Sequence, residues 1–139
     1  MFIWWDINSM ARIYFKTRDT LLSLDLETIA LVRAEGNYTR IYYINQHEIL
    51  LTLGIGRMEQ ILYESKSSKF HFVRLGRSII VNHAYFQLID LQKQILELSD
   101  KGRNTVRINI AKPILKSYKE AIEKSVIIEQ QRLYENKNR

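Results

Sequence analysis

Cysteine is absent from the 139-residue chain, and proline occurs only once. Without cysteine the chain can build neither a disulfide framework nor a thiolate zinc site, which favours a cytoplasmic location. No apolar run approaches the roughly 20 residues of a membrane-spanning helix. The opening segment MFIWWDINSM lacks the basic region and the cleavage site of a signal peptide. We therefore expect a cytoplasmic protein that does not cross a membrane.

Acidic residues are scarce in one part of the chain. Residues 69–119 contain ten Lys and Arg residues and only three acidic residues, although the net charge of the whole chain is only +6. A basic block on an otherwise balanced protein is typical of a polyanion partner, more often nucleic acid than a membrane surface. A solvated basic surface is the alternative, and composition alone does not separate the two.

Groups that support catalysis or metal binding are few. His47, His71 and His83 lie on separate expected strands or turns, without the recurrent spacing of metal ligands. Ser78 and His71 could act as nucleophile and base, but no nucleophile elbow accompanies them. The segment GIGR at 54–57 lacks the lysine and the full glycine pattern of a phosphate loop. We expect no enzyme, no metal site and no cofactor.

Apolar and polar residues alternate with a period of two through most of the chain, which predicts antiparallel strands. The first two runs, 12–16 and 22–26, flank the polar turn RDT and predict a hairpin. Further strands are expected at 29–34, 38–45, 47–53, 70–74, 78–82, 85–91, 93–98 and 104–110. Many short strands in succession favour small antiparallel sheets over a parallel sheet.

Two segments have helical spacing instead. Met58, Ile61 and Leu62 predict a short helix over 56–65. Pro113 suits a first helical turn, and the apolar residues that follow it predict a C-terminal helix that continues through 123–135. The fold class is therefore mostly β, with one short internal helix and a C-terminal helix.

The segment FVRLGRSIIVN, residues 72–82, places Arg74 and Arg77 around Leu75 and Gly76. A strand that only fills a core would carry charges at its ends, so these two guanidinium groups need a partner. Basic side chains on loops between strands can approach a DNA groove without a recognition helix. Three segments combine a strand end with such donors: EGNYTR at 35–40, VRLGRS at 73–78 and NIAKP at 109–113.

Three segments, in this order, resemble the LytTR family of bacterial DNA-binding domains: IALVRAEGNYTRIYY, FHFVRLGRSIIVN and VRINIAKPILKSYKEAI. The second is similar to the family signature Phe-x-Arg-x-His-Arg-Ser, followed by an apolar pair and Val-Asn. The similarity covers roughly residues 11–122. We expect residues 1–10 to be an N-terminal tail, 11–122 the DNA-binding domain, and 123–139 a helical extension with a polar tail. The resemblance implies an elongated stack of small antiparallel sheets.

The resemblance also implies a function. Family members bind duplex DNA as transcriptional regulators and place loop residues into successive major grooves. Carried over motif by motif, the expected DNA contacts are Tyr38, Arg77 and Lys112. Further expected contacts are Arg74, Asn37, Arg40, Ser78 and Lys116. Many family members are response regulators with a receiver domain ahead of the DNA-binding part, whereas only about ten residues precede it here. We therefore expect a stand-alone domain.

Each principal contact has a structural alternative. Arg77 could bind a guanine edge or a phosphate, or it could form an ion pair with Asp90 or Glu97. Tyr38 could contact the DNA backbone or a thymine methyl, or it could pack across strands beside Tyr42.

Two positions differ from the family pattern. The family histidine before the signature arginine is Gly76 here, and the usual Ser-Arg of the last motif is Ala111-Lys112. Both differences weaken base-specific recognition more than general DNA affinity. Lys112 could also be a solvated lysine at a helix start.

An alternative function remains open, namely a protein-interaction module of a signalling system that kept the fold and lost specific DNA recognition. The final helix carries apolar residues beyond position 122, which could contact a second copy of the chain or a separate sensor, or pack on the domain.

Overall fold

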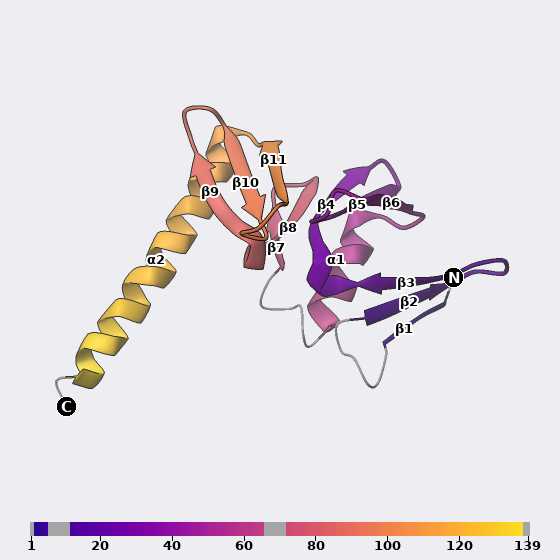
Figure 1. Cartoon of the computed structure of the whole chain (residues 1–139), viewed down its shortest axis with the longest axis horizontal. Coiled ribbons are helices and arrows are strands. Elements are labelled where there is room, and N and C mark those ends of the chain that lie inside the picture. The colour runs from indigo at the N-terminus through magenta and orange to yellow at the C-terminus, as the bar shows by residue number, and fades with distance from the viewer. Residues whose placement is uncertain (1, 6–11, 66–71, 138–139) are drawn as a thin grey trace. The chain divides into compact units, whose positions relative to one another are not determined.

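A computed structural model describes residues 2–5, 12–65 and 72–137 (Figure 1). Within them the strands form three small antiparallel sheets, accompanied by two α-helices. The prediction of a mostly β fold is confirmed. The chain divides into two compact units, which are Met1–Gln87 with Leu98–Val106, and Leu88–Glu97 with Arg107–Arg139.

The first sheet has the order β1-β2-β3, formed by β1 (Phe2–Trp5), β2 (Arg12–Lys16) and β3 (Leu21–Asp25). The β2–β3 hairpin lies where the alternation predicted it. Strand β1 lies within the segment expected to be a tail, because its run of apolar residues shows no alternation. Cross-strand pairs run from Phe2 opposite Lys16 to Trp5 opposite Ile13.

The central sheet has five strands in the order β6-β5-β4-β8-β7. Their bounds are β4 (Ile29–Glu35), β5 (Tyr38–Tyr43), β6 (Glu48–Leu51), β7 (Phe72–Leu75) and β8 (Ile79–Asn82). Part of the strand expected at 70–74 lies outside the described residues. The strand order places two hairpins, β4–β5 and β7–β8, beside each other in this sheet.

Helix α1 (Ile55–Glu64) packs against the central sheet (Figure 1). Its buried residues Met58, Ile61 and Leu62 are the three that its spacing predicted. They share one core with residues of β2 to β5 and β8, among them Ile13, Leu24, Val32, Ile41 and Ile80. Burial of these side chains, at about 25 cal/mol per Å² of apolar surface, stabilises this unit.

Two short 3₁₀ helices follow strands of the first unit: η1 (Leu26–Thr28) follows β3, and η2 (His83–Tyr85) follows β8. The side chain of Asn82 accepts a hydrogen bond from the Ala84 N–H at 3.0 Å and donates to the Ile29 carbonyl at 2.9 Å. These two hydrogen bonds fix the turn after β8. Because Asn82 is only 2% exposed, it links β8 to β4 and is not available to read a base.

The third sheet has the order β11-β10-β9, formed by β9 (Phe86–Asp90), β10 (Ile95–Ser99) and β11 (Thr105–Asn109). The Asp100 carboxylate organises the turn before β11, because it accepts hydrogen bonds from the Asn104 side chain and from the backbone N–H groups of Gly102 and Asn104. These bonds, that of the Asn104 side chain above all, hold the pKa of Asp100 below its usual value.

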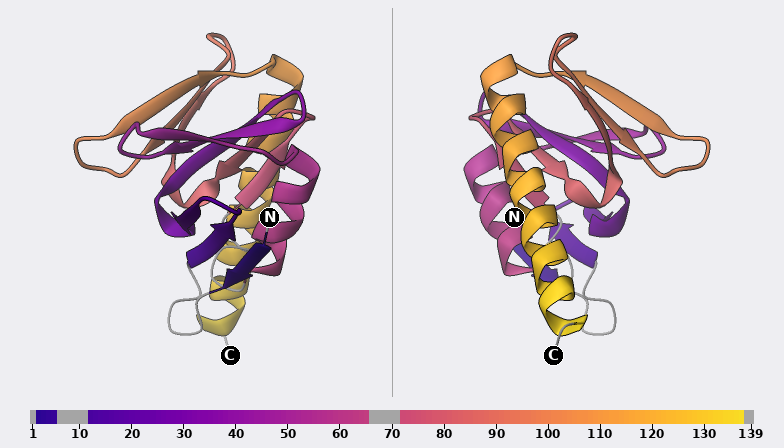
Figure 2. Two further views of the ribbon diagram at one scale, coloured as in Figure 1. Left: turned by 90° about the vertical axis from the view of Figure 1, so that its right-hand side faces the viewer. Right: turned by 90° about the vertical axis from the view of Figure 1, so that its left-hand side faces the viewer.

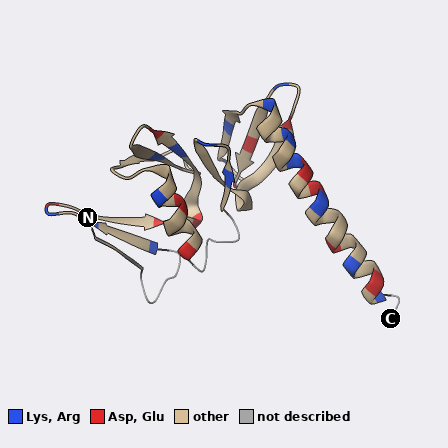
Figure 3. Cartoon of the chain, turned by 180° about the vertical axis from the view of Figure 1, so that it is seen from behind, with Lys and Arg blue, Asp and Glu red and all other residues tan. Residues whose placement is uncertain are grey.

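Helix α2 (Lys112–Lys137) follows and is uninterrupted (Figure 2). Leu115 and Tyr118 are buried in its first turns, and burial raises the pKa of Tyr118. Basic and acidic residues are mixed along the helix (Figure 3). Its later apolar residues are exposed, namely Val126, Ile127, Ile128, Leu133 and Tyr134. Among the described residues, no helix is long and apolar enough to cross a membrane.

Candidate nucleic-acid interface

Two turns lie at the same end of the central sheet. Strands β4 and β8 are antiparallel neighbours, with Arg33 opposite Ile79. The turn that follows β4 and the turn that precedes β8 therefore meet at one end. The Ala34 N–H donates a 2.8 Å hydrogen bond to the Ser78 carbonyl, which joins the turn before β8 to the end of β4.

The β4–β5 turn contains only Gly36 and Asn37, because Glu35 is paired with Tyr38. Gly36 has a φ of 58°, and no positive φ occurs at Asn37. A positive φ at the first of two central residues is typical of a type II′ turn, which favours glycine there. The turn leaves Asn37 exposed and Tyr38 47% exposed.

The β7–β8 turn comprises Gly76, Arg77 and Ser78, because Leu75 is paired with Ile79. Gly76 has a φ of 68°, a conformation that other L-residues rarely adopt. Arg77 and Ser78 are exposed, and the Arg77 side chain forms no hydrogen bond or ion pair with any described residue. We call Asn37, Tyr38, Arg77 and Ser78 the turn surface.

Arg74 behaves differently from Arg77, although both belong to one hairpin. Its Nε donates to the Gly76 carbonyl at 3.0 Å, and its Nη2 donates to the Arg77 carbonyl at 2.7 Å. Its Nη1 forms an ion pair of 2.9 Å with Oε1 of Glu59 on α1. The partners that Arg74 needs are therefore inside the protein.

Arg40 is also engaged within the sheet. Its Nε and Nη2 donate to the two carboxylate oxygens of Glu35 at 2.6 and 3.1 Å, and its Nη1 donates to Glu48 at 3.1 Å. The hydrogen bond from Arg40 holds the pKa of the Glu35 carboxyl below its usual value, and the same bond raises the pKa of Arg40. Arg40 thereby neutralises the charge of Glu35 beside the turn surface.

Among the described residues, Arg77 forms no ion pair with Asp90 or Glu97, and Tyr38 makes no ring contact with Tyr42. Tyr42 lies instead with its ring under the Arg33 guanidinium, at 5.9 Å from the ring centroid. Glu97 faces Arg107 at 3.8 Å. Tyr38 and Arg77 both stay exposed.

Lys112 and Lys116 lie in the second unit, in the first turns of α2, and both are exposed. They are four residues apart on the helix and lie on one face. Of the expected contacts, the central sheet thus gathers Asn37, Tyr38, Arg40, Arg74, Arg77 and Ser78, whereas the two lysines belong to a separate unit.

The Ser78–His71 pair considered for an enzyme falls partly outside the described residues. Ser78 is in an exposed turn, and His71 lies outside the described residues. No group of three or more His, Asp or Glu residues that could hold a metal ion is present among the residues that the structure describes.

Sequence reasoning missed two acidic residues of this region, Glu35 and Glu59. Glu35 precedes the turn glycine, and its position across the expected hairpin from Arg40 could have indicated the ion pair. Glu59 is 15 positions from Arg74 and on a different type of element, so nothing in the pattern pairs them.

Comparison with known proteins identifies the family of the chain. The family model described as the LytTr DNA-binding domain matches residues 19–123. The chain belongs to the LytTR family. The identification from the three sequence motifs is confirmed.

Among solved structures, the LytTR chain is similar to the LytTr DNA-binding domain of a putative methyl-accepting/DNA response regulator from Bacillus cereus. The two chains are 18% identical, the match covers 81% of this chain and 96% of the other, and the TM-score is 0.56. At this identity the likeness shows the fold. No curated protein matches the chain.

Proposed function

We propose that this LytTR domain binds duplex DNA sequence-specifically, as a cytoplasmic bacterial transcriptional regulator, with its turn surface in the major groove. Membership of a family of DNA-binding domains supports DNA as the partner. The observation that carries the proposal is Arg77, an exposed guanidinium with no partner among the described residues, on a turn that is hydrogen-bonded to β4.

Arg77 is the proposed base contact. A guanidinium can donate two hydrogen bonds to the O6 and N7 atoms of guanine, which discriminates against other bases by about 1–3 kcal/mol. Tyr38, on the adjoining turn, would contact sugar, phosphate or a thymine methyl. Asn37 and Ser78 would donate to phosphates and fix the position of the turns on the duplex.

Lys112 and Lys116 are proposed phosphate contacts. A lysine ammonium acts as a point charge and lacks the planar fork that recognises a base edge. Both residues lie at the N-terminal end of a long helix, where the helix dipole also favours negative charge. Their contribution to binding would be general and independent of the DNA sequence.

A contact of the C-terminal helix with a second copy or with a sensor stays a prediction. The exposed apolar residues between Val126 and Tyr134 are compatible with either partner. Assembly as a pair would let the domain occupy two adjacent half-sites on DNA.

Fluorescence anisotropy tests the proposal with a labelled duplex from immediately upstream of the protein's own coding region and with a scrambled duplex. Wild-type affinity should be higher for the first duplex and should fall steeply with KCl, because neutralised phosphates release counterions. Arg77→Ala should weaken specific binding by about 1–3 kcal/mol and relax the preference at one base position. Lys116→Ala should weaken binding to both duplexes equally and reduce the salt slope by about one.

Arg18→Ala is the matched control, since Arg18 is an exposed arginine in the β2–β3 turn, outside the central sheet. It should leave the preference between the duplexes unchanged. Equal binding of wild type to both duplexes and to duplexes selected from a random library would contradict sequence-specific recognition. That result would support the alternative of a protein-interaction module.

A further inference from the structure

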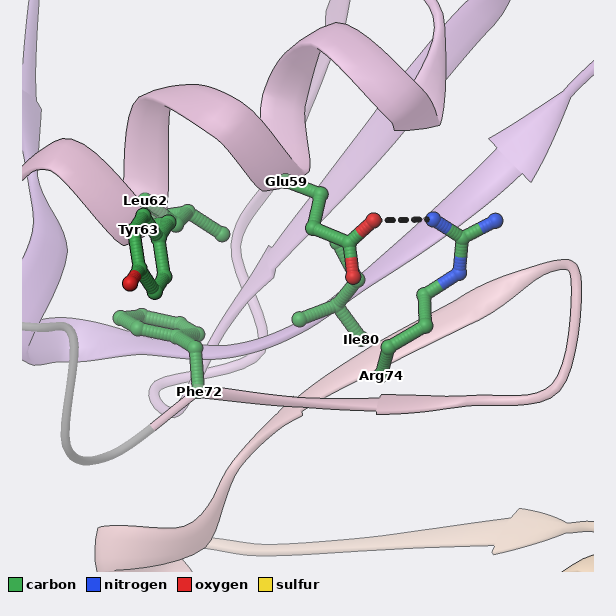
Figure 4. A pocket seen from close by; sticks show the side chains of 6 residues that line it. All are labelled: Glu59, Leu62, Tyr63, Phe72, Arg74 and Ile80. Atoms are coloured by element: carbon green, nitrogen blue, oxygen red, sulfur yellow. Dashed lines mark hydrogen bonds and ion pairs between the residues drawn. The ribbon is translucent and has the colours of Figure 1, made fainter.

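The β7–β8 turn has an internal brace. Figure 4 shows Glu59 on α1 reaching toward Arg74 on β7, and the dashed line marks their 2.9 Å ion pair. From the same guanidinium, two further donors reach the carbonyl groups of Gly76 and Arg77. One side chain therefore joins the helix to two consecutive peptide groups of the turn.

We infer that Arg74, held by Glu59, is a positioning residue that sets the conformation of the β7–β8 turn and acts on DNA recognition through Arg77. This inference rests on the proposed function, in which Arg77 contacts a base. It assigns Arg74 a role other than the direct phosphate contact that the sequence suggests.

The hydrogen bonds carry this assignment. A guanidinium has five N–H donors, and three separate acceptors inside the protein already engage Arg74 through all three of its nitrogens. Its side chain is 27% exposed, and the carboxylate of Glu59 balances its charge. A phosphate could reach only the two remaining N–H groups of a guanidinium whose charge Glu59 already balances, whereas Arg77 beside it is exposed and has no partner among the described residues.

Turn geometry explains why bracing is needed. A three-residue turn with a positive φ at Gly76 has few hydrogen bonds of its own to define its shape, and glycine is the most flexible residue. Arg74 binds the carbonyl groups of the two peptides that precede and follow the Cα atom of Arg77. Recognition of a base requires the Arg77 guanidinium to be held in a defined position. A mobile turn would therefore reduce the specificity of DNA binding before it reduced general DNA affinity.

The space around this ion pair does not fit a ligand site. Glu59, Leu62, Tyr63, Phe72, Arg74 and Ile80 line a pocket of about 80 Å³ (Figure 4). Pockets for small molecules commonly measure about 300–1,000 Å³. The ion pair is thus better explained as a structural connection between α1 and the turn.

Two substitutions separate positioning from charge. Arg74→Lys keeps the positive charge but loses the planar fork, because an ammonium does not reach all three acceptors in the same geometry. Glu59→Ala removes a negative charge, which by electrostatics alone would strengthen DNA binding. If both residues act by positioning, both variants should instead weaken specific binding.

The first experiment measures ¹⁵N heteronuclear NOEs of the DNA-free protein, which report picosecond–nanosecond motion. Arg74→Lys and Glu59→Ala should lower the NOE at Gly76, Arg77 and Ser78. The β4–β5 turn at Gly36 and Asn37 is the internal control and should not change. Unchanged NOEs in the β7–β8 turn of both variants would overturn the inference, whether or not the protein binds DNA.

The second experiment repeats the anisotropy assay with the two duplexes. Arg74→Lys should lower the preference for the specific duplex by about tenfold, similar to loss of one base contact. In an Arg77→Ala background the same substitution should change affinity by less than about twofold, because the two residues act as one unit. Full wild-type preference in Arg74→Lys, or tighter specific binding in Glu59→Ala, would overturn the positioning role.

Urea unfolding of each variant establishes that it is folded under assay conditions. If Arg74→Lys is unfolded, Glu59→Ala decides the question alone, because its side chain is half exposed on a helix surface. Absence of any preference in the wild type would contradict the proposed function, and the NOE measurement would still decide whether Arg74 orders the turn.

Discussion

Arg74 and Arg77 illustrate how neighbouring residues of one type differ in role. Arg74 points to α1 and to its own turn, so that its charge is balanced and three of its five donors are engaged. Arg77 is exposed, with its donors left for an external acceptor. The surroundings of these two side chains, and not their chemical type, distinguish Arg74, which binds within the protein, from Arg77, the proposed DNA contact.

The backbone conformation at position 76 is expected to require glycine. Gly76→Ala should lower the free energy of unfolding by about 1–2 kcal/mol, because an L-residue is strained at a φ of 68°. Gly56→Ala is the matched control, since Gly56 lies exposed in α1 with open space around it. That change should stabilise the protein by about 0.5–1 kcal/mol. Urea denaturation measures both, and equal effects of the two changes would contradict the argument.

Thr39 adjoins Tyr38 but is fully buried, and its hydroxyl has no hydrogen-bond partner among the described residues. Burial of an unpaired polar group costs about 1–3 kcal/mol, so Thr39→Val should raise the free energy of unfolding by about 1 kcal/mol.

Thr28→Val is the control for this change. The Thr28 hydroxyl donates to the Asp25 carbonyl at 3.0 Å, and its loss should destabilise the protein by about 1 kcal/mol. Thermal and urea unfolding measure both variants. A destabilised Thr39→Val protein would show that the hydroxyl has a partner.

At the scale of elements, the Glu35–Arg40–Glu48 group spans three adjacent strands. Arg40 holds the pKa of Glu35 below its ordinary value of 4.5. Because the folded-state pKa is the lower one, this pair stabilises the fold above the ordinary pKa and stops doing so as the pH falls through the lowered value.

A ¹³C NMR titration of the Glu35 carboxyl carbon measures this effect. In Arg40→Met the titration midpoint should rise toward 4.5. In the control Arg18→Met it should stay where it is in the wild type, because Arg18 is not among the charges that act on Glu35. A midpoint that is equal in wild type and Arg40→Met would refute the ion pair.

Strand positions followed from the sequence because half-buried strands alternate, as illustrated in β2 by Ile13 and Phe15, which are buried between more exposed neighbours. Helix α1 followed from the spacing of Met58, Ile61 and Leu62, because a helix that packs on a core buries residues three and four positions apart. Strand β1 did not, since it shows no alternation. The Glu59–Arg74 contact could not be predicted either, because it depends on how a helix packs on a sheet.

For the molecule as a whole, α2 is expected to be unevenly stable. Its first turns bury Leu115 and Tyr118, whereas residues beyond 122 are exposed in the described chain. A helix without packing is marginal in water. Amide hydrogen exchange should therefore be faster at 125–135 than at 115–120. Equal protection at low protein concentration would contradict this expectation, and protection that grows with concentration would support a second copy as the partner.

The bracing of the β7–β8 turn by Arg74 also has a consequence for how DNA recognition could change in evolution. If Arg74 and Gly76 define the backbone of the β7–β8 turn, the side chain at position 77 is not needed for folding. Under the proposed function, exchange of Arg77 for Gln, which pairs with adenine N6 and N7, would redirect the domain to a new DNA sequence without changing its fold. Promoter choice could thus evolve by changing a single codon.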